Sequence, residues 1–349
     1  MHTKTLIIGG GLTGLSLAYR LQQAGRDYLL IEARQRLGGR IKSLTVADTK
    51  FDLGPSWIWS GQDRVAALLT ELGMTTFAQW SDGAQLYEQS NGEVLQNSGF
   101  MSMAGSYRIS GGTSALTDAL AVKLDPSRIR TGSAATHISA DPIGAQVAGS
   151  FITAERIVLA VPPRIAAELN YTPALPDQAR SSLRAIPTWM GAHAKFVAVY
   201  PTPFWRENGL SGDASSRRGP LVEIHDASPD GGNLGALFGF VGVPATARAD
   251  AGEALAQAAI AQLVNLFGAE AGNPIATQLA DWSQAAFIAS PADATPPPGH
   301  PPYHMPAALR QVWDGKLIFA VTELTSDNGG LIEGALAASQ AAADRILSA

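Results

Sequence analysis

The sequence predicts an α/β fold in two parts: a larger strand–helix–strand part and a smaller α+β part that contains a mixed sheet. Two observations support the larger part. The apolar run from Leu6 to Ile8 is rich in β-branched residues, and after three glycines apolar residues recur at helical spacing. A second apolar run, Asp27 to Ile31, follows this helix and predicts the next strand.

The glycines after the first strand form the motif G-x-G-x-x-G, which is typical of Rossmann-like dinucleotide-binding domains. Gly9 makes the tight turn, Gly11 lets the backbone approach a pyrophosphate, and Gly14 lets the helix pack closely on the strand. At Leu12 and Thr13 the N-terminus of the helix offers N–H groups and partial positive charge to the phosphates.

The acid at the end of the second strand supports the same interpretation. Glu32 lies eighteen residues after Gly14, close to the spacing of about 20 expected for the acid that binds a ribose 2′-OH. A glutamate here favours the unphosphorylated ribose of NAD or FAD over that of NADP. The alternative is a glycine-rich turn of an ordinary α/β protein, but strand, helix, second strand and acid are all in register.

Composition excludes several classes of function. The 349 residues suggest one large domain or two intertwined domains. Hydrophobic residues make up 46% and charged residues only 16%, so much of the surface is expected to be internal or covered. The net charge of −5 argues against nucleic acid as the main partner. The absence of cysteine excludes disulfides, thiolate metal sites, a catalytic thiol and a cysteinyl link to a cofactor.

Neither a membrane location nor a metal site is expected. Residues 1–4 precede an apolar run as in a signal peptide, but the three glycines and the second strand argue against one. No apolar run reaches the length of a membrane span, so we expect a cytoplasmic protein without a membrane partner. His300 and His304 lie four residues apart, but Pro301 and Pro302 prevent a helix between them, which disfavours a metal pair.

Two further motifs follow Glu32. Residues 32–40 read E-A-R-x-R-x-G-G-R, and residues 52–56 read D-L-G-x-S. Together they resemble the flavin-containing amine oxidase superfamily, which includes the monoamine and polyamine oxidases. The resemblance implies FAD as cofactor; the alternative for the arginines is a solvated loop. Besides the residues of the first glycine turn, it places the following residues at the FAD: Glu32, Ala33, Arg34, Gly38, Gly39, Arg40, Gly54, Pro55, Ser56, Trp57 and Ala135.

The C-terminal part is similar to the closing F-A-G-T-E … G-x-x-E-G-A motif of the same family. Lys316 to Thr322 predicts a strand, and Leu331 to Leu347 predicts a helix. The resemblance places Gly330, Leu331 and Ile332 against the flavin. A helix N-terminus there would stabilise the negative charge that a reduced flavin accumulates at one edge.

Two residues of this motif are informative individually. Glu323 resembles the family's acid that hydrogen-bonds the ribityl chain of FAD. Val321 stands where the family has glycine, so a side chain must be accommodated there.

A third match lies in mid-chain. Residues 190–200, followed by Pro203, Phe204 and Trp205, resemble the family's lysine-bearing strand. Lys195 is the lone lysine of an apolar strand, which is unusual for a group that is rarely buried. The resemblance implies that Lys195 reaches flavin N5 through a water, and burial would lower its pKa so that it assists proton movement or reaction with dioxygen. The alternative is a lysine on an edge strand or one whose ammonium group extends to solvent.

The departures from the family concern the substrate side. Ala292 and Leu331 fall where monoamine oxidases have two facing aromatic residues, and Pro291 falls where some carry a cysteine linked to FAD. We therefore expect non-covalent FAD and no aromatic cage. The helical insertion before residues 111–113 is also missing, and only a hairpin-like stretch, residues 84–103, takes its place. The substrate chamber is expected to be more open.

These matches predict a discontinuous Rossmann-like FAD-binding domain and a smaller α+β substrate domain with a mixed sheet. The substrate domain is expected to contain strands at 193–200 and 234–242 and a helix at 252–267. We assign to the FAD-binding domain residues 1–75, 110–180 and 285–349, and to the substrate domain residues 76–109 and 181–284.

The expected function is that of an FAD-dependent oxidoreductase acting on a small molecule. By resemblance it oxidises a C–H bond next to an amine nitrogen, with dioxygen as acceptor and hydrogen peroxide as product. One alternative is a flavin oxidase or dehydrogenase of a non-amine substrate, such as a dihydronicotinamide, carotenoid-like or porphyrinogen-like molecule. Another is a flavoprotein without turnover that acts by binding. A simple NAD dehydrogenase leaves the C-terminal motif unexplained. The sequence predicts no oligomeric state.

Overall fold

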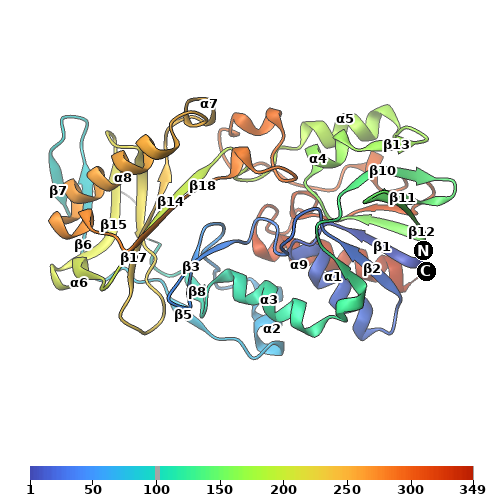
Figure 1. The fold of residues 1–349 in the computed structure, drawn as a ribbon, viewed down its shortest axis with the longest axis horizontal. Helices are drawn as coiled ribbons and strands as arrows, with labels where there is room; N and C mark the ends of the chain where they lie inside the picture. Colours follow the sequence, from blue (N-terminus) through green and yellow to red (C-terminus); the bar gives the residue numbers. More distant parts are fainter. Residues whose placement is uncertain (99–102, 349) are drawn as a thin grey trace.

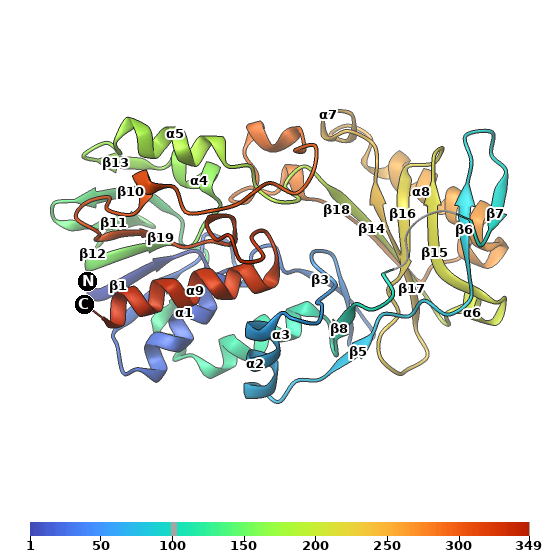
Figure 2. The ribbon, with the colours of Figure 1, turned by 180° about the vertical axis from the view of Figure 1, so that it is seen from behind.

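A computed structural model describes residues 1–98 and 103–348 of the chain. Two large sheets form the two ends of an elongated molecule (Figure 1). The N- and C-termini lie side by side at the far end of the eight-stranded sheet in both views (Figures 1 and 2). The chain crosses between the two ends several times, so neither end is a single continuous segment.

The eight-stranded sheet has the order β13-β10-β11-β12-β1-β2-β9, and β19 also pairs with β12. Its centre is parallel, because β1 pairs in parallel with β2 and β12, and β12 pairs in parallel with β19. β10, β11 and β12 form an antiparallel meander. The strands are β1 (His2–Ile8), β2 (Tyr28–Ile31), β9 (Ile129–Arg130), β10 (Ala135–Ala140), β11 (Ile143–Val147), β12 (Ser150–Leu159), β13 (Asn170–Thr172) and β19 (Leu317–Phe319).

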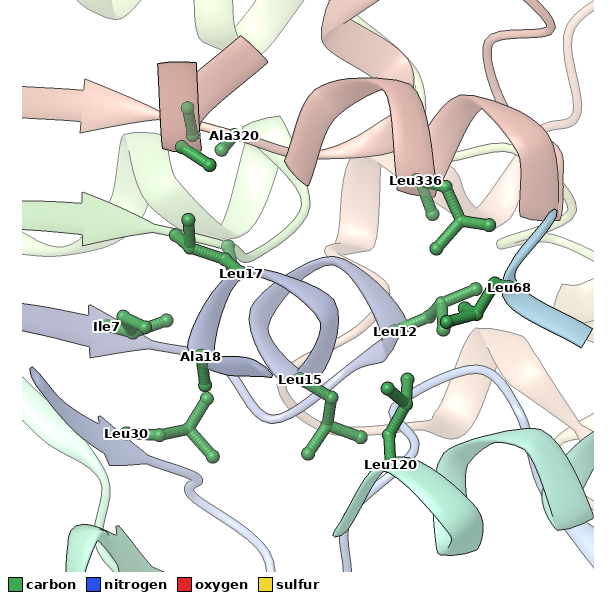
Figure 3. Packing of buried hydrophobic residues seen from close by; sticks show 14 of the residues in the cluster. Ile7, Leu12, Leu15, Leu17, Ala18, Leu30, Leu68, Leu120, Ala320 and Leu336 are labelled. Atoms are coloured by element: carbon green, nitrogen blue, oxygen red, sulfur yellow. The ribbon is translucent and has the colours of Figure 1, made fainter. Parts of the chain in front are cut away.

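Helices cover both faces of this sheet. Because side chains alternate along a strand, Ile7 of β1 packs on one face, and Leu6 and Ile8 pack on the other. Figure 3 shows Leu15 and Ala18 of the first helix packed between the sheet and the neighbouring helices. The helices on the Ile7 face are α1 (Leu12–Gln23), α2 (Asp63–Glu71), α3 (Thr113–Lys123) and α9 (Ile332–Leu347), and those on the opposite face are α4 (Pro163–Glu168) and α5 (Asp177–Ala185).

The seven-stranded sheet is mixed, with the order β18-β14-β17-β16-β15-β6-β7. All neighbours are antiparallel except β15 and β6. Phe196 and Ala198 of β14 pack in the core with α8, whereas Val197 and Val199 belong to a core on the other face. The elements are β6 (Ala84–Glu88), β7 (Val94–Gln96), β14 (Ala194–Tyr200), β15 (Leu210–Ser216), β16 (Leu221–Asp226), β17 (Gly235–Val241), β18 (Ala276–Asp281), α6 (Phe204–Glu207), α7 (Ala245–Arg248) and α8 (Gly252–Phe267).

Two small sheets and several short 3₁₀ turns complete the described elements. The small sheets are β3 (Ser43–Val46) with β4 (Thr49–Asp52) and β5 (Thr76–Ala78) with β8 (Tyr107–Ile109). The 3₁₀ turns are η1 (Pro126–Arg128), η2 (Ala269–Gly272), η3 (Trp282–Gln284), η4 (Pro291–Ala294), η5 (Ala307–Leu309) and η6 (Thr322–Leu324). In the part of the chain that the structure describes, no helix combines the length and apolar character needed to cross a membrane.

The structure confirms the predicted α/β fold with its second, mixed sheet. The expected strands at 193–200 and 234–242 correspond to β14 and β17, and the expected helix 252–267 is α8. The strand expected from Lys316 to Thr322 is shorter, because β19 ends at Phe319 and a 3₁₀ turn follows. The alternative that Lys195 lies on an edge strand is excluded, because β14 lies between β17 and β18.

The hairpin expected over residues 84–103 is formed by β6 and β7, which pair antiparallel. Residues 99–102 of this stretch lie outside the described residues. The strands of the two large sheets fall within the two sets of segments assigned above. The domain boundaries themselves remain a prediction.

Candidate functional site between the two sheets

A cavity of about 460 Å³ lies between the two large sheets, and segments from both line it. Its lining includes the loop after β1, the end of β2, the loop after β4, the start of β14 and the start of α9. Nearly all predicted site residues meet here, although they come from distant parts of the sequence. Only Gly14 and Glu323 of the predicted set do not line the cavity.

The first glycine turn forms one wall of the cavity. Gly9 has a positive φ of 113°, and a Cβ there would lie 2.4 Å from the carbonyl oxygen of Ala160. A Cβ on Gly11 would meet no atom nearer than 3.9 Å, so the backbone is open to the cavity at this residue. Gly14 has a packing role, because a Cβ there would lie 1.9 Å from the Gly9 oxygen. Its small size therefore lets α1 approach β1.

The second glycine pair packs on the first turn, backbone against backbone. The N–H of Gly38 donates a 2.8 Å hydrogen bond to the oxygen of Gly10. Gly39 has a positive φ of 59°, and a Cβ there would lie 3.1 Å from the Cα of Gly11. Arg36 donates hydrogen bonds to the carbonyl oxygens of Gly39 and Ile41, which fixes this loop. The two motifs thus form one glycine-lined cradle.

Glu32 stands at the edge of this cradle. Its carboxylate accepts a 2.7 Å bond from the N–H of Gly10 and a 2.9 Å bond from the N–H of Arg34. Each carboxylate oxygen has a second lone pair, so it can also accept a bond from a ribose hydroxyl. The contact of Glu32 with a ribose hydroxyl stays a prediction.

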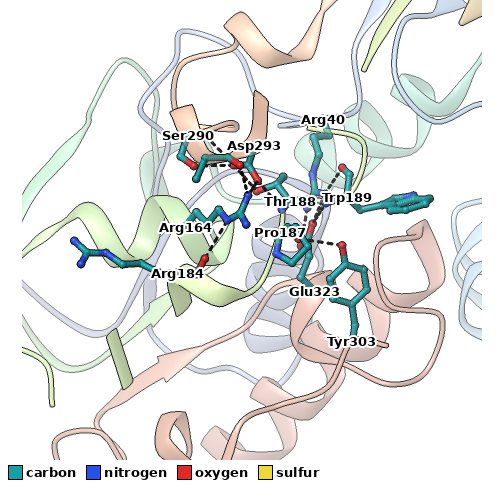
Figure 4. Close-up of polar contacts among 11 residues, drawn as sticks. Arg40, Arg164, Arg184, Pro187, Thr188, Trp189, Ser290, Asp293, Tyr303 and Glu323 are labelled. Atoms are coloured by element: carbon teal, nitrogen blue, oxygen red, sulfur yellow. Dashed lines mark hydrogen bonds and ion pairs between the residues drawn. The ribbon is translucent and has the colours of Figure 1, made fainter. Parts of the chain in front are cut away.

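Two arginines add positive charge to the cavity wall. Arg34 and Arg40 both line the cavity. Figure 4 shows Arg40 paired with Glu323, which accepts bonds at both carboxylate oxygens, one of them 3.0 Å long. Burial alone would lower the pKa of Arg40, but the charge of Glu323 holds it above its ordinary value. Arg40 therefore stays cationic beside the cradle.

Glu323 itself is fully buried and lies behind Arg40. Its carboxylate also accepts a 3.1 Å bond from the N–H of Trp189. Glu323 does not itself line the cavity. Its bonds hold Arg40 and the segment at Trp189, both of which do, in place. The direct bond from Glu323 to the ribityl chain of FAD, which the resemblance implies, stays a prediction.

A neighbouring network fixes the segment before Trp189. Asp293 is buried and accepts bonds from Arg164, at 2.7 Å, and from the N–H of Thr188, at 2.9 Å. The hydroxyl of Tyr303 donates a 3.0 Å bond to the carbonyl oxygen of Pro187 (Figure 4). These bonds connect α4, η4 and the segment after η4 to one stretch of the cavity wall.

The N-terminus of α9 closes another side. Gly330, Leu331 and Ile332 line the cavity, and the N-cap residue Leu331 offers no side-chain cap. The first N–H groups of α9 therefore give this side partial positive charge. Val321, which replaces the family's glycine, is buried in the apolar core between sheet and helices and also lines the cavity. The fold thus accommodates its side chain in the core.

Lys195 extends from β14 into the wall of the cavity and is 3% exposed. Its Nζ donates a 2.7 Å bond to Oγ of Ser56 and a 3.2 Å bond to the carbonyl oxygen of Gly54. It also lies 3.7 Å from the ring centroid of Phe238. Burial lowers the pKa of Lys195 to about 7, with Asp52 opposing the shift and Arg108 adding to it.

Sequence reasoning missed Glu223 and Phe240, which line the cavity from β16 and β17. Neither belongs to a motif. The available signal was the run Glu223, His225 and Asp226, which places charged groups in an otherwise apolar strand. Other lining residues that were not predicted include Trp189, His193, Trp282, Phe287 and Ile288. Ala292, expected at an aromatic position, is not among the lining residues.

The polar groups that line the cavity are better suited to binding a dinucleotide than a metal ion. Phosphates and a polarised ring system would be bound well by three features of the cavity wall. These are the glycine cradle that is open at Gly11, the two arginines, and the two helix N-termini without side-chain caps. In residues 1–98 and 103–348, no group of three or more histidine or acidic side chains could hold a metal ion.

Comparisons with known proteins agree with this geometry. The model of the family "Flavin containing amine oxidoreductase" matches residues 12–94 and 87–347. A putative flavin-containing monoamine oxidase of Mycobacterium tuberculosis is 24% identical, with 98% of this chain and 96% of the relative aligned. Putrescine oxidase of Kocuria rosea is 23% identical, with 99% and 95% aligned.

Solved structures share the fold. A wild-type putrescine oxidase bound to putrescine superposes with a TM-score of 0.83 at 20% identity, over 100% of both chains. Cyclohexylamine oxidase from Brevibacterium oxydans gives a TM-score of 0.83 at 22% identity, over 99% of both chains.

Proposed function

The chain belongs to the family of flavin-containing amine oxidoreductases, and on this premise we propose that it oxidises the C–H bond next to the nitrogen of a small-molecule amine, with dioxygen as electron acceptor. It is an oxidoreductase, and its cofactor is FAD. Because the chain has no cysteine, a cysteinyl link to the cofactor is excluded, and we expect non-covalent binding.

We assign the ends of FAD from the chemistry of the cavity wall. The cradle at Gly11 and Gly39 suits the pyrophosphate, because backbone N–H groups and the N-terminus of α1 converge there. Glu32 suits the adenosine ribose. With the pyrophosphate and the ribose placed in this way, the flavin ring would lie at the end of the cavity formed by Lys195 and the start of α9.

The observation that carries the proposal is the position of Lys195. A buried amine with a pKa near 7 projects into the same cavity as the glycine cradle. Ser56 and the carbonyl of Gly54 fix its Nζ, so a proton can be held or released at one defined point. A group with a pKa near neutrality is well suited to proton transfer.

Bound FAD would supply the two-electron chemistry by accepting a hydride equivalent from the substrate carbon. The protein contributes the surroundings. Trp57, Phe240 and Trp282 line the cavity, and a substrate between their apolar rings would have less contact with water, which strengthens electrostatic interactions. The N-terminus of α9 offers partial positive charge where the ring would gain negative charge.

The reaction balances with dioxygen and water. The amine loses two electrons and two protons and becomes an imine, which water hydrolyses to a carbonyl compound and ammonia or a smaller amine. Dioxygen takes up two electrons and two protons and becomes hydrogen peroxide.

The test is an aerobic assay of the purified holoprotein with primary, secondary and cyclic amines. Oxygen uptake, hydrogen peroxide and carbonyl product should appear in equal amounts, and protein freed of FAD should give none. Substrate consumption without oxygen uptake would show that another acceptor is used. Activity confined to non-amine substrates would favour the alternative of a flavin oxidase or dehydrogenase of a non-amine substrate.

A further inference from the structure

A further cavity of about 370 Å³, which we call the second cavity, lies where the loop between β16 and β17 meets the two small sheets and the start of α3. It shares no lining residue with the cavity between the two large sheets. In Figure 2 the small sheets lie between the two large sheets. The volume is within the range of small-molecule sites. The charged residues of its lining are Asp48, Lys50, Arg108 and Asp230.

Arg108 of β8 is the buried cation of the second cavity, with 4% of its surface exposed. In the described chain its side chain makes one hydrogen bond, of 2.7 Å from Nη1 to the carbonyl oxygen of Ser228. Its Nε is buried and has no partner. The guanidinium carbon lies 5.3 Å from the ring centroid of Phe77, which carries no charge. Since a guanidinium group has five N–H donors, most of them remain without a partner.

The carboxylates near Arg108 do not fully balance its charge. Burial lowers the pKa of Arg108, with Asp52 and Asp226 opposing the shift. Arg206 adds to the shift, and Asp226 is paired with that arginine at 2.8 Å. The charge of Asp52 acts on Lys195 as well as on Arg108. Lys195 and Arg108 thus share one carboxylate, and a buried cation is costly unless an anion pairs with it.

A glycine loop supplies neutral donors to the second cavity. Gly231 and Gly232 have positive φ, 70° and 84°, and a Cβ on either would meet no atom within 4 Å. Among the described residues, their N–H groups have no partner. Free N–H groups of such a loop are suited to an anion. The N-terminus of α3 adds little, because Asp52 already accepts the N–H of Thr113 at 2.8 Å.

The other charged residues of the second cavity are in contact with water. Lys50 is half-buried and pairs with the exposed Asp118 at 2.5 Å. Asp48 and Asp230 are exposed. Water therefore screens their repulsion of an anion more than it screens the attraction of the buried Arg108. The inner part of the cavity is thus expected to attract an anion.

We propose that the second cavity is a regulatory site that binds the phosphate group of a small molecule, with Arg108 as its main cation. The fork of N–H groups on a guanidinium matches the oxygens of a phosphate, and the loop at Gly231 and Gly232 supplies donors to the same group. Free inorganic phosphate and a phosphate monoester share this chemistry. The site lies outside the cavity of the proposed amine oxidation, so binding does not depend on that function.

Regulation acts from Arg108 to Lys195 through charge. Burial lowers the pKa of Lys195, Asp52 opposes the shift, and the positive charge of Arg108 adds to it. A phosphate group at Arg108 would offset that positive charge. The pKa of Lys195 should therefore rise when the second cavity is filled.

The other neighbours of Lys195 leave Asp52 and Arg108 as the charges that act on its pKa. The flanking strands β17 and β18 place Phe240 and Ala280 beside Lys195, and neither residue titrates. His193 and Glu223 line the same cavity as Lys195 but do not contribute to its shift.

The first test is calorimetric titration of the holoprotein, at constant ionic strength, with inorganic phosphate, glycerol 3-phosphate and malonate. In the holoprotein the phosphate site of FAD itself is filled. The wild type should bind one of the two phosphate compounds with a Kd of about 1 mM or lower. Arg108→Gln should weaken this binding roughly 10- to 100-fold, because a charge-assisted hydrogen bond is lost. Arg217→Gln changes an exposed arginine outside both cavities and is the matched control.

Tighter binding of glycerol 3-phosphate would identify a phosphate monoester as the ligand, and tighter binding of inorganic phosphate would identify the free ion. Equal affinities in the wild type and Arg108→Gln, binding of malonate alone, or no binding at all would overturn the proposal. If Arg108→Gln does not fold, Lys50→Gln replaces it. That variant should weaken binding roughly two- to fivefold, as expected for a partly exposed charge, and an unchanged affinity contradicts the proposal.

The second test measures how the rate of flavin reoxidation by dioxygen depends on pH, with and without saturating phosphate compound. The flavin is reduced by light, so no amine is needed. Phosphate should move the inflection near pH 7 to higher pH. Arg108→Gln should have the higher inflection already, with no further shift on addition of phosphate.

An inflection that phosphate leaves in place would overturn the regulatory role. Failure of the function proposed for Lys195 has a different signature. If the wild-type rate shows no inflection at all, that function is wrong, and the calorimetric comparison of wild type with Arg108→Gln decides the phosphate site alone.

Discussion

The Nζ of Lys195 lies 2.7 Å from Oγ of Ser56, and this bond joins the mixed sheet to the loop that follows β4. The two residues are 139 positions apart in sequence. The loop also contributes Gly54, Pro55 and Trp57 to the cavity wall. The bond thus links β14 of the seven-stranded sheet to the loop after the small β3–β4 sheet, at the end of the cavity where we place the flavin ring.

Lys195→Met should slow reoxidation of the reduced protein by dioxygen by roughly 100-fold, the usual range for a positioned proton donor. Reduction of dioxygen builds negative charge on oxygen, and a buried ammonium group stabilises it. With a pKa of about 7, the wild-type rate should fall as the pH rises through 7, and the variant should lack this inflection.

Stopped-flow mixing of reduced protein with aerated buffer measures these rates. Lys123→Met changes an exposed lysine of α3 and serves as the control. Equal reoxidation rates in Lys195→Met and wild type would assign Lys195 a purely structural role.

Lys195 should also affect how stability depends on pH. Its pKa is lowered from 10.5 to about 7, so between these values the unfolded chain binds a proton that the folded chain does not. The contribution of this group to the free energy of unfolding therefore rises with pH across that window. Urea denaturation from pH 7 to 9.5 should show wild type gaining stability relative to Lys195→Met. A constant difference between the two would mean that the amine is not titrated on unfolding.

Gly11→Val should abolish FAD retention. Gly11 has φ −74°, which valine also adopts, and its Cβ would project into open cavity space. The fold is therefore expected to persist while the place of the pyrophosphate is filled. Gly299→Val is the control, since Gly299 has no neighbour within 4 Å of a built Cβ. The flavin absorbance of the purified variants measures their FAD content. Full FAD content in Gly11→Val would show that the pyrophosphate does not lie at Gly11.

Glu323→Gln should destabilise the protein by about 3–5 kcal/mol, the range for a buried charge left without its partner. Arg40 would lose the carboxylate that keeps it cationic beside the cradle. Glu168→Gln breaks an exposed pair with Arg184 and should cost at most about 1 kcal/mol. Chemical denaturation of both holoproteins gives the comparison, and similar losses would show that the Arg40–Glu323 pair is no stronger than a surface pair.

The parts of the site that sequence could predict are those set by local backbone requirements. Gly9 and Gly39 have positive φ, and Gly11 leaves open the space that a cofactor would fill, so each demands glycine and leaves a readable motif. The role of Lys195 was predictable because lysine is rarely buried, so a lysine within an apolar strand indicates a function.

Other features depend on contacts between distant segments. The ion pair of Glu323 with Arg40 spans 283 positions, and nothing near either residue indicates it. Glu223 reaches the cavity through the register of β16 on β17, which the strand sequence does not specify. The close approach of Gly14 to Gly9, in contrast, agrees with the packing role that the motif predicts.

The most direct test of amine oxidation by bound FAD is anaerobic mixing of the holoprotein with single compounds while the oxidised flavin absorbance is recorded. The panel contains diamines, secondary and cyclic amines, benzylamine and a reduced nicotinamide. We expect a bulkier secondary or cyclic amine to bleach the flavin in one exponential phase. The second-order rate constant for benzylamine should stay below about 10⁴ M⁻¹s⁻¹, because Leu331 lines the cavity where monoamine oxidases have an aromatic residue. Bleaching by the reduced nicotinamide alone, with every amine leaving the spectrum unchanged, would contradict the account.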